Sequence, residues 1–236
     1  MSRAPSVRSS VAEPLAVRDL VVRGDDDRTI LTVPSLDVPA GTSLGVRGPS
    51  GAGKTTLLYA LAGLLPKASG RVVWGDVDLL SLPRGRRARF RRERLGFVFQ
   101  DALLFEELPA LANAALAAAF APRSRRDGLR RRATGHLDAF GIAAGRRTVR
   151  SYSGGERQRI SLARALAGDP SVLLADEPTA SLDAAAKGTL VADLVGVART
   201  GGKTLISVSH DRSLLAAMDA TITIEAGEVV EAQDDP

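Results

Sequence analysis

Several residue types are scarce or missing in this chain of 236 residues, and each absence excludes a class of protein. The sequence contains no cysteine, so it has neither a disulfide framework nor a thiolate metal site, which suits a protein of the reducing cytosol. No uninterrupted apolar run approaches the ~20 residues that span a bilayer. Residues 1–13 carry arginine and serine without an apolar segment, so we expect a flexible tail there and no secretory signal.

Arginine carries almost all of the positive charge, because only four of the 32 basic residues are lysines and the net charge is +5. The arginines gather at residues 84–94 and 123–132. Solvated helix faces explain these clusters best, and an anionic membrane or partner surface and a nucleic acid are the alternatives. Aromatic residues, 4% of the chain, are not interleaved with the clusters, so we expect no nucleic-acid partner.

Hydrophobic patterning predicts one large α/β domain, preceded by the short tail. Two strands rich in valine and leucine, at residues 15–22 and 29–38, flank three aspartates and predict an antiparallel hairpin. Further strands are expected at residues 43–47, 70–74, 95–99, 172–175, 204–208, 220–224 and 228–230. Helices are expected at residues 54–65, 84–94, 111–120, 125–140, 155–168 and 184–199, with Pro66 ending the first of them.

Residues 48–55 fit the pattern G-x-x-x-x-G-K-[ST], the phosphate-binding P-loop, between an expected strand and the N-terminus of an expected helix. Glycines let successive backbone N–H groups point at phosphate oxygens. Lys54 adds a charge for the β- and γ-phosphates, and Thr55 offers a hydroxyl to Mg²⁺. We therefore predict binding of a nucleoside triphosphate with Mg²⁺. The expected contacts are Gly48, Pro49, Ser50, Gly51, Ala52, Gly53, Lys54, Thr55 and Thr56.

An aspartate and a glutamate follow the apolar strand at residues 172–175. Asp176, at the carboxyl end of that strand, is positioned to bind Mg²⁺ beside the phosphates. Glu177 is positioned to orient a water for in-line attack on the γ-phosphate. By themselves these two acids also fit a turn or a helix cap; together with the P-loop they predict a catalytic site.

A second anion-binding helix start is expected at Ser153-Gly154-Gly155. One nucleotide does not need two such cradles. We therefore expect a dimer in which this cradle covers the triphosphate held by the P-loop of the other copy. An ordinary capped helix is the alternative for this tripeptide taken alone.

These motifs occur in the order found in ABC-type ATPases, the nucleotide-binding subunits of ABC transporters, which the chain resembles over residues 15–230. The motifs are residues 48–55, Gln100, Ser153-Gly154-Gly155-Glu156, Asp176-Glu177, Ser181-Leu182-Asp183 and His210. The arginines before residues 95–100, and residues 175–183, are most similar to the lipoprotein-releasing, macrolide-efflux and cell-division members. The implied fold is a P-loop NTPase (RecA-like) core with an N-terminal antiparallel β subdomain.

The resemblance also implies domain limits: one ABC ATPase domain at residues 14–236. Its nucleotide-binding core comprises residues 14–100 and 169–236, and residues 101–168 form an inserted, mainly α-helical subdomain.

The resemblance implies roles for four further side chains. Gln100 would contact Mg²⁺ or the attacking water, and His210 would hydrogen-bond the γ-phosphate and hold Glu177 in line. Asp183 would lie at the dimer interface. Gln158 would lie near the ribose or phosphates of the facing nucleotide.

One departure from the family concerns the nucleotide base. The family stacks an aromatic side chain of the first hairpin on adenine, but no aromatic residue precedes Tyr59 here. A guanidinium plane can stack on a base, so Arg23 is our hypothesis for a replacement. Aromatic stacking is worth ~1–3 kcal/mol, so we expect weaker binding or looser base choice.

The resemblance implies a membrane partner as well. Its cytoplasmic helix would dock between Gln100 and Ala119, where Leu103, Phe105 and Leu108 supply apolar surface. Since this chain has no membrane span of its own, the permease would be a separate subunit. The ATPase would lie on the cytoplasmic face of the cell membrane and drive export or extraction. A force-transmitting or signalling ATPase is the main alternative, and a nucleic-acid-associated ATPase is a weaker one.

Overall fold

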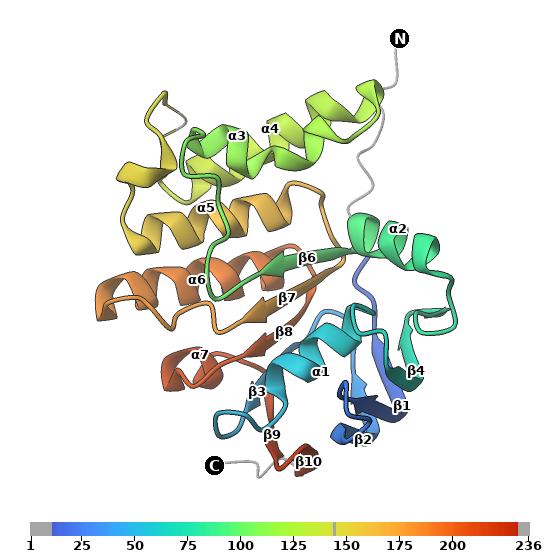
Figure 1. Cartoon of the computed structure of the whole chain (residues 1–236). Helices are drawn as coiled ribbons and strands as arrows, with labels where there is room; N and C mark the ends of the chain where they lie inside the picture. Colours follow the sequence, from blue (N-terminus) through green and yellow to red (C-terminus); the bar gives the residue numbers. More distant parts are fainter. Residues whose placement is uncertain (1–10, 144, 231–236) are drawn as a thin grey trace.

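The computed structural model describes residues 11–143 and 145–230, whose strands form one ten-stranded sheet, ordered β5-β4-β1-β2-β10-β9-β3-β8-β7-β6 (Figure 1). Parallel pairing joins β9 (Ala220–Glu225), β3 (Ser43–Arg47), β8 (Thr204–Val208), β7 (Val172–Asp176) and β6 (Leu95–Val98). Antiparallel pairing joins β1 (Leu15–Arg23), β2 (Thr29–Val38), β4 (Ala68–Trp74) and β5 (Val77–Asp78), which confirms the first hairpin. β10 (Glu228–Val230) links the two halves, antiparallel to β9 and parallel to β2.

The parallel half of the sheet is covered on both faces, which explains why its strands read as continuous apolar runs. Along β7, Val172 and Leu174 pack into one core together with α1 (Lys54–Leu61) and the antiparallel strands. The alternate residues Leu173 and Ala175 pack into a second core with α5 (Gly154–Leu166) and α6 (Ala184–Thr200). This two-sided burial holds the carboxyl ends of β3, β7 and β8 at one edge.

Between β6 and β7 the chain is largely helical, and its helices stack in a layer above the sheet in Figure 1. They are α3 (Ala110–Ala114), the 3₁₀ segments Leu116–Ala119 and Val149–Ser151, α4 (Arg123–Ala139) and α5. A helical region was expected at residues 101–168. Its limits as a subdomain stay a prediction. The expected tail at residues 1–13 lies mostly outside the described residues, since residues 1–10 are not described.

The helix after the P-loop ends earlier than predicted, at Leu61 and not at residue 65. Gly63, at φ +62°, takes the left-handed conformation, and its N–H donates to Ala60 O while Leu64 N–H donates to Tyr59 O. This pair of hydrogen bonds is the Schellman arrangement that closes a helix at a glycine. Gly63 therefore ends the helix, and Pro66 does not.

The predicted helix at residues 111–120 is also interrupted. Helix α3 stops at Ala114, and the chain continues as a 3₁₀ turn, in which Ala118 N–H donates to Ala115 O. The alanines of this segment carry no pattern that marks such a change. Three short elements were not predicted: β5, the 3₁₀ segment Val149–Ser151, and α7 (Arg212–Ala216), which Asp211 caps.

The arginine cluster at residues 84–94 forms α2 (Arg84–Arg94), the helix that was predicted. Most of its arginines are exposed, as solvated helix faces require. Arg87 and Arg91 are half-buried and donate to carbonyl oxygens of Leu82 (2.7 Å) and Gly63 (3.1 Å). Arg91 therefore fastens α2 to the end of α1, and Arg87 fastens it to the segment that precedes α2. Among the described residues, no helix has the length and hydropathy to cross a bilayer.

Candidate active site

The P-loop connects β3 to α1 at the carboxyl edge of the parallel sheet. Gly48 (φ +148°) and Gly53 (φ +102°) have positive φ angles that residues with a side chain rarely adopt. A Cβ on Gly48 would also lie 2.0 Å from Ile224 O. No other residue type fits there without moving β9. The sequence pattern at this loop is thus required by the backbone, and the loop presents N–H groups at the start of α1.

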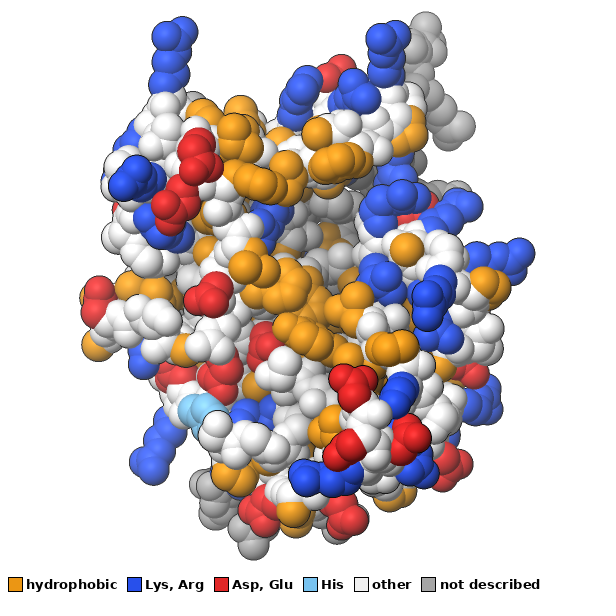
Figure 2. Space-filling view, in the orientation of Figure 1, with side chains coloured by type: hydrophobic (Ala, Val, Ile, Leu, Met, Phe, Trp, Pro, Cys, Tyr) orange, Lys and Arg blue, Asp and Glu red, His pale blue; other side chains and the backbone are white. Residues whose placement is uncertain are grey.

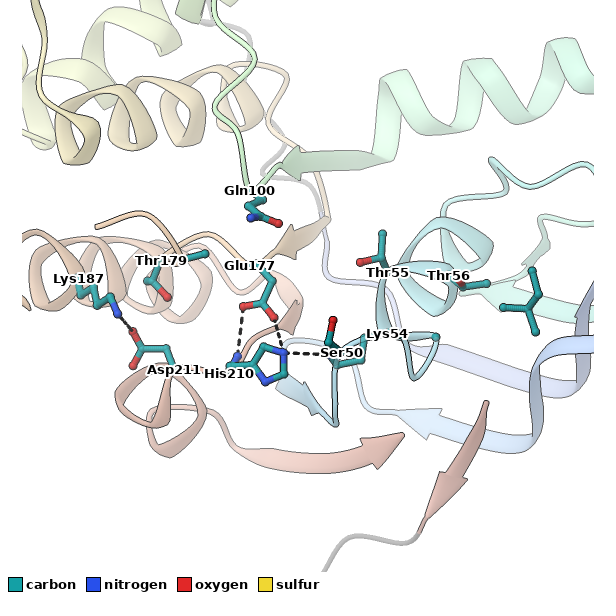
Figure 3. A pocket seen from close by; sticks show the side chains of 14 residues that line it. Ser50, Lys54, Thr55, Thr56, Gln100, Glu177, Thr179, Lys187, His210 and Asp211 are labelled. Atoms are coloured by element: carbon teal, nitrogen blue, oxygen red, sulfur yellow. Dashed lines mark hydrogen bonds and ion pairs between the residues drawn. The ribbon is translucent and has the colours of Figure 1, made fainter. Parts of the chain in front are cut away.

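A cavity of about 580 Å³ opens over the P-loop (Figure 3). Its walls come from β2, the P-loop, and the segments after β6, β7 and β8. The lining residues are Ile30, Ser50, Gly51, Gly53, Lys54, Thr55, Thr56, Gln100, Glu177, Thr179, Ala180, Lys187, His210 and Asp211. The structure therefore brings Lys54, Thr55, Gln100, Glu177 and His210 together as the sequence predicts, although more than 150 positions separate the first from the last.

Lys54 is buried, and its ammonium is held across the loop. Nζ donates to Gly48 O (2.8 Å) and Pro49 O (3.0 Å) and lies 3.0 Å from Nε2 of His210. These partners fix the ammonium above the curled backbone of the loop, which suits a charge that meets β- and γ-phosphate oxygens.

Glu177 has a strained backbone at φ +43°, an uncommon value for a residue with a Cβ. Its N–H donates to Val208 O (2.9 Å), and this bond joins β7 to the end of β8. The carboxylate faces His210: Oε2 accepts from His210 N (3.2 Å), and Oε1 lies 3.3 Å from Nε2 (Figure 3). A strained conformation held by a neighbouring strand is typical of catalytic positions, and it aims this carboxylate into the cavity.

The contacts of His210 Nε2 depend on its proton. Lys54 can only donate, so a neutral imidazole accepts from it and carries its own proton on Nδ1. An imidazole that carries a proton on Nε2 instead donates to Glu177. The same N–H can donate to a γ-phosphate oxygen, so the proton on Nε2 decides which partner His210 pairs with.

Asp176 ends β7 and is largely buried behind Glu177. Burial raises the pKa of this carboxyl, and the Thr55 hydrogen bond to Oδ1 (3.1 Å) and the Lys54 charge oppose the shift. A buried carboxylate and a hydroxyl that already meet, with the Gln100 amide on the same cavity, are hard oxygen ligands of the kind Mg²⁺ prefers. The residues therefore fit Mg²⁺. No cluster of three or more His, Cys, Asp or Glu suited to a metal occurs in the described parts of the chain.

Gln158 was expected near the ribose or phosphates of a facing nucleotide, and that role stays a prediction. Its side chain is 5% exposed, and Nε2 donates to Phe99 O (3.0 Å) and Gln100 O (2.7 Å). These carbonyl oxygens follow β6 and need donors. Gln158 thus fixes the backbone beside Gln100.

The second predicted cradle lies outside the P-loop cavity. Ser153 caps α5: its Oγ accepts from Glu156 N (3.3 Å), and its N–H donates to Glu156 Oε2 (2.7 Å). The hydrogen bond from the Ser153 N–H is the main cause that lowers the pKa of Glu156. Gly155 is buried against α6, where an added Cβ would lie 2.8 Å from that of Ala186. Asp183 caps α6 by accepting from Ala186 N (2.9 Å).

Arg23 does not line the cavity. It is exposed, and Nη1 donates to Asp27 O (3.0 Å) within the first hairpin. Ile30, the neighbour of Gly24 in space, lines the cavity instead and is 39% exposed. Thr179, Ala180, Lys187 and Asp211 also line the cavity and were not predicted from the sequence. Asp211 directly follows His210 in the sequence, and this adjacency could have indicated that Asp211 lies at the cavity.

A family model described as ABC transporter matches residues 31–180. This chain belongs to the ABC transporter family. Within that family it is an ATP-binding subunit and an ATPase. The lipoprotein-releasing system ATP-binding protein LolD of Syntrophus aciditrophicus is 38% identical over 198 residues, 83% of this chain and 87% of LolD.

Two further relatives span almost the whole chain. The uncharacterized ABC transporter ATP-binding protein YbbA of Escherichia coli is 38% identical over 226 residues, 94% of this chain and 97% of YbbA. The solved dimeric structure of the ATP-binding cassette MJ0796 in a post-hydrolysis state, bound to ADP and Pi, superposes with a TM-score of 0.81. It is 28% identical and covers 93% of this chain and 97% of its own. The α/β P-loop NTPase fold predicted from the sequence is confirmed.

Proposed function

We propose that this ABC ATPase binds Mg·ATP in the P-loop cavity, closes head to tail with a second copy around two nucleotides, and drives a separate membrane subunit. The observation that carries the proposal is the meeting of Lys54, Glu177 and His210 at one cavity, with Thr55 and Asp176 hydrogen-bonded beside it. This set can bind a triphosphate, orient a water and stabilise the charge that develops during its attack.

In the proposed reaction the oxygen of a water attacks the γ-phosphorus. The bond to the β–γ bridging oxygen breaks, its electron pair stays on ADP, and the proton that the water loses passes to the Glu177 carboxylate. Glu177 accepts a hydrogen bond from that water and aligns it, and His210 binds the γ-phosphate from the other side. Lys54 stabilises the charge on the transferred group. Thr55, Asp176 and Gln100 would hold Mg²⁺, which neutralises phosphate charge when bound.

The dimer in this proposal explains why the Ser153 cradle lies outside the P-loop cavity. A cradle that serves the nucleotide of another copy has to face outward, and Ser153 and Gly154 are exposed at the start of α5. The solved cassette MJ0796 forms dimers. Asp183, exposed near Gly154 at the start of α6, is a candidate for the contact between copies.

The proposed docking surface for the membrane subunit is the segment between Gln100 and Ala119. Leu103 (61% exposed), Phe105 (52%) and Leu108 (37%) present apolar side chains there, and Leu103 has a left-handed backbone at φ +47°. A neighbouring groove of about 610 Å³ is lined by Leu108, Pro109, Leu111, Leu116 and alanines, with Arg130 and Arg146 at its sides. Figure 2 shows apolar side chains on this helical layer and in the hollow below it.

An apolar groove of this kind accepts an amphipathic helix. A permease helix docked there would place the ATPase on the cytoplasmic face of the membrane. The LolD relatives carry lipoprotein-releasing in their names, so export or extraction is the proposed direction of transport.

The test is the Glu177→Gln variant, purified with Mg·ATP from gently solubilised native membranes. We expect size-exclusion chromatography to detect an ATP-dependent dimer, and mass spectrometry to detect a multi-spanning membrane protein in stoichiometric amount. Lys54→Ala in the same background is the control and should abolish the dimer. A variant that stays monomeric at saturating Mg·ATP would contradict the closed dimer. A few-helix partner with a large extracytoplasmic domain would favour force transmission, and nucleic-acid-bound partners would overturn transport.

A further inference from the structure

The P-loop cavity extends past the proposed catalytic side chains to the first turns of α6. Lys187 lines that end of the cavity, and its ammonium points toward Asp211 and away from Lys54 and Thr55 (Figure 3). The distance from Nζ to Asp211 Oδ2 is 3.9 Å. Neither residue belongs to the motifs that predicted the site.

Asp211 is tightly held in this position. Its side chain is 10% exposed, and Oδ1 accepts from Ser213 N (2.9 Å) and Ser213 Oγ (2.6 Å), which caps α7. Burial raises the pKa of this carboxyl, but hydrogen bonding by Ser213, Thr179 and the Leu214 backbone together outweighs burial, and the net pKa shift is downward. A shielded, ionised carboxylate needs a cation, and Lys187 is its ion-pair partner among the described residues.

The loop that carries His210 is thereby fixed from three sides. Glu177 accepts from the His210 N–H, Asp211 N donates to Ser209 Oγ (3.0 Å), and Lys187 faces the Asp211 carboxylate. Among these three contacts, the Lys187 contact is the one that comes from α6. That helix starts at the Asp183 cap, and the Lys187 N–H donates to Asp183 O (2.9 Å) in its first turn.

We propose that Lys187 is a positioning residue for hydrolysis: by binding Asp211 it ties the start of α6 to the His210 loop. His210 can contact a γ-phosphate only if its loop keeps its place at the cavity. Through the Lys187 ion pair, the position of the His210 loop depends on the position of the first turn of α6, which begins after Asp183. This inference rests on the proposed role of His210.

The test compares Lys187→Met with Arg212→Met, which removes the same charge from an exposed neighbour of Asp211. We expect Lys187→Met to lower kcat for ATP about tenfold, since misplacing a catalytic group can cost up to about 10²-fold. KM for ATP and Tm should stay close to those of the unmodified chain. Lys187→Arg should restore most of kcat, because its guanidinium also reaches a carboxylate. Arg212→Met should leave kcat unchanged.

Two further measurements separate positioning from other roles. In an Asp211→Asn background, Lys187→Met should cause no further loss of kcat, and additive losses would overturn the proposal. Lys187→Met should also leave the ATP-driven dimer of the Glu177→Gln chain intact, whereas loss of that dimer would make Lys187 an intersubunit contact. His210→Ala alone tests the premise: if it keeps full kcat, the role of His210 fails, independently of the Lys187 result.

Discussion

At the scale of single residues, the site is built so that each catalytic side chain has partners of its own. Glu177 is aimed by a strained backbone and a hydrogen bond to β8, and His210 lies between a cation and a carboxylate. Gln158 is a supporting residue of the same kind, because its amide holds the Gln100 backbone. Such supporting contacts decide how precisely the reacting groups meet.

The site offers fewer contacts to the base of the nucleotide than to its phosphates. We expect Ile30→Trp to tighten Mg·ATP binding about tenfold, since stacking of an aromatic side chain on a base is worth ~1–3 kcal/mol. Ile30 is partly exposed on the cavity wall, so a larger ring at this position can extend into the cavity. Isothermal titration calorimetry with Mg·ATP and with Mg·tripolyphosphate measures the gain.

The tripolyphosphate affinity should not change in this variant, because only the base contact is added. Arg23→Ala is the matched control and should leave both affinities unchanged, since Arg23 bonds within its own hairpin. An equal gain for tripolyphosphate would mean that the new ring acts on the P-loop. A loss of ATP affinity in Arg23→Ala would return the base contact to Arg23.

At the scale of elements, helix α5 controls the loop after β6. Gln158 donates to Gln100 O, and Arg164 donates to Leu103 O (2.6 Å) and Ala102 O (2.7 Å). The Ser153 cradle begins the same helix. Any rotation of α5 that follows closure of a dimer on this cradle must therefore move the Gln100 loop and the apolar residues beyond it.

Hydrogen bonds between β3 and the start of β9 predict that the free energy of unfolding depends on pH. Ser43 N and Oγ each donate to Asp219 Oδ2 at 2.7 Å, and these bonds, with Arg199 beside them, lower the pKa of Asp219. We expect Asp219→Asn to lower the free energy of unfolding by about 1 kcal/mol, a value reduced for partial exposure of the carboxylate. Urea unfolding from pH 7 to pH 3.5 measures it.

The direction of this pH dependence follows from the lowered pKa of Asp219. An Asp with a lower pKa in the folded state stabilises fully above its ordinary pKa of about 3.9, and this is lost as pH falls through the folded-state pKa. The difference between Asp219→Asn and the unmodified chain should stay constant from pH 7 to pH 5 and narrow below about pH 4. Asp127→Asn, at an exposed site, should show no such trend. A difference at pH 3.5 as large as the difference at pH 7 would contradict the assignment.

The sequence could predict those elements whose signal is local. The apolar runs of β7 and β8, the P-loop, and the acids after β7 are short contiguous patterns with a direct physical cause. The end of α1 could have been found at Gly63, a glycine in the position that a Schellman closure requires. The inward turn of Gln158 and the cavity positions of Ile30 and Lys187 depend on contacts between distant segments, which no local pattern records.

At the scale of the whole molecule, the fold separates two surfaces. The P-loop cavity lies at the carboxyl edge of the parallel strands, and the proposed docking surface lies beyond the Gln100 loop on the helical layer. The loop of residues 99–103 and helix α5 join them through the hydrogen bonds of Gln158 and Arg164. A membrane subunit seated on the docking surface can therefore respond to the nucleotide without touching it.

The final prediction concerns the proposed docking surface. We expect Phe105→Asp, in the Glu177→Gln chain, to reduce recovery of the membrane subunit about tenfold or more, since a buried charge without a partner in an apolar contact costs several kcal/mol. Phe120→Asp is the matched control: Phe120 is 82% exposed, lies outside the segment between Gln100 and Ala119, and should leave recovery unchanged. Quantitative mass spectrometry of purified complexes measures both. Equal recovery with Phe105→Asp would move the docking surface elsewhere, whereas a loss with both variants would extend it across the tip of the helical layer.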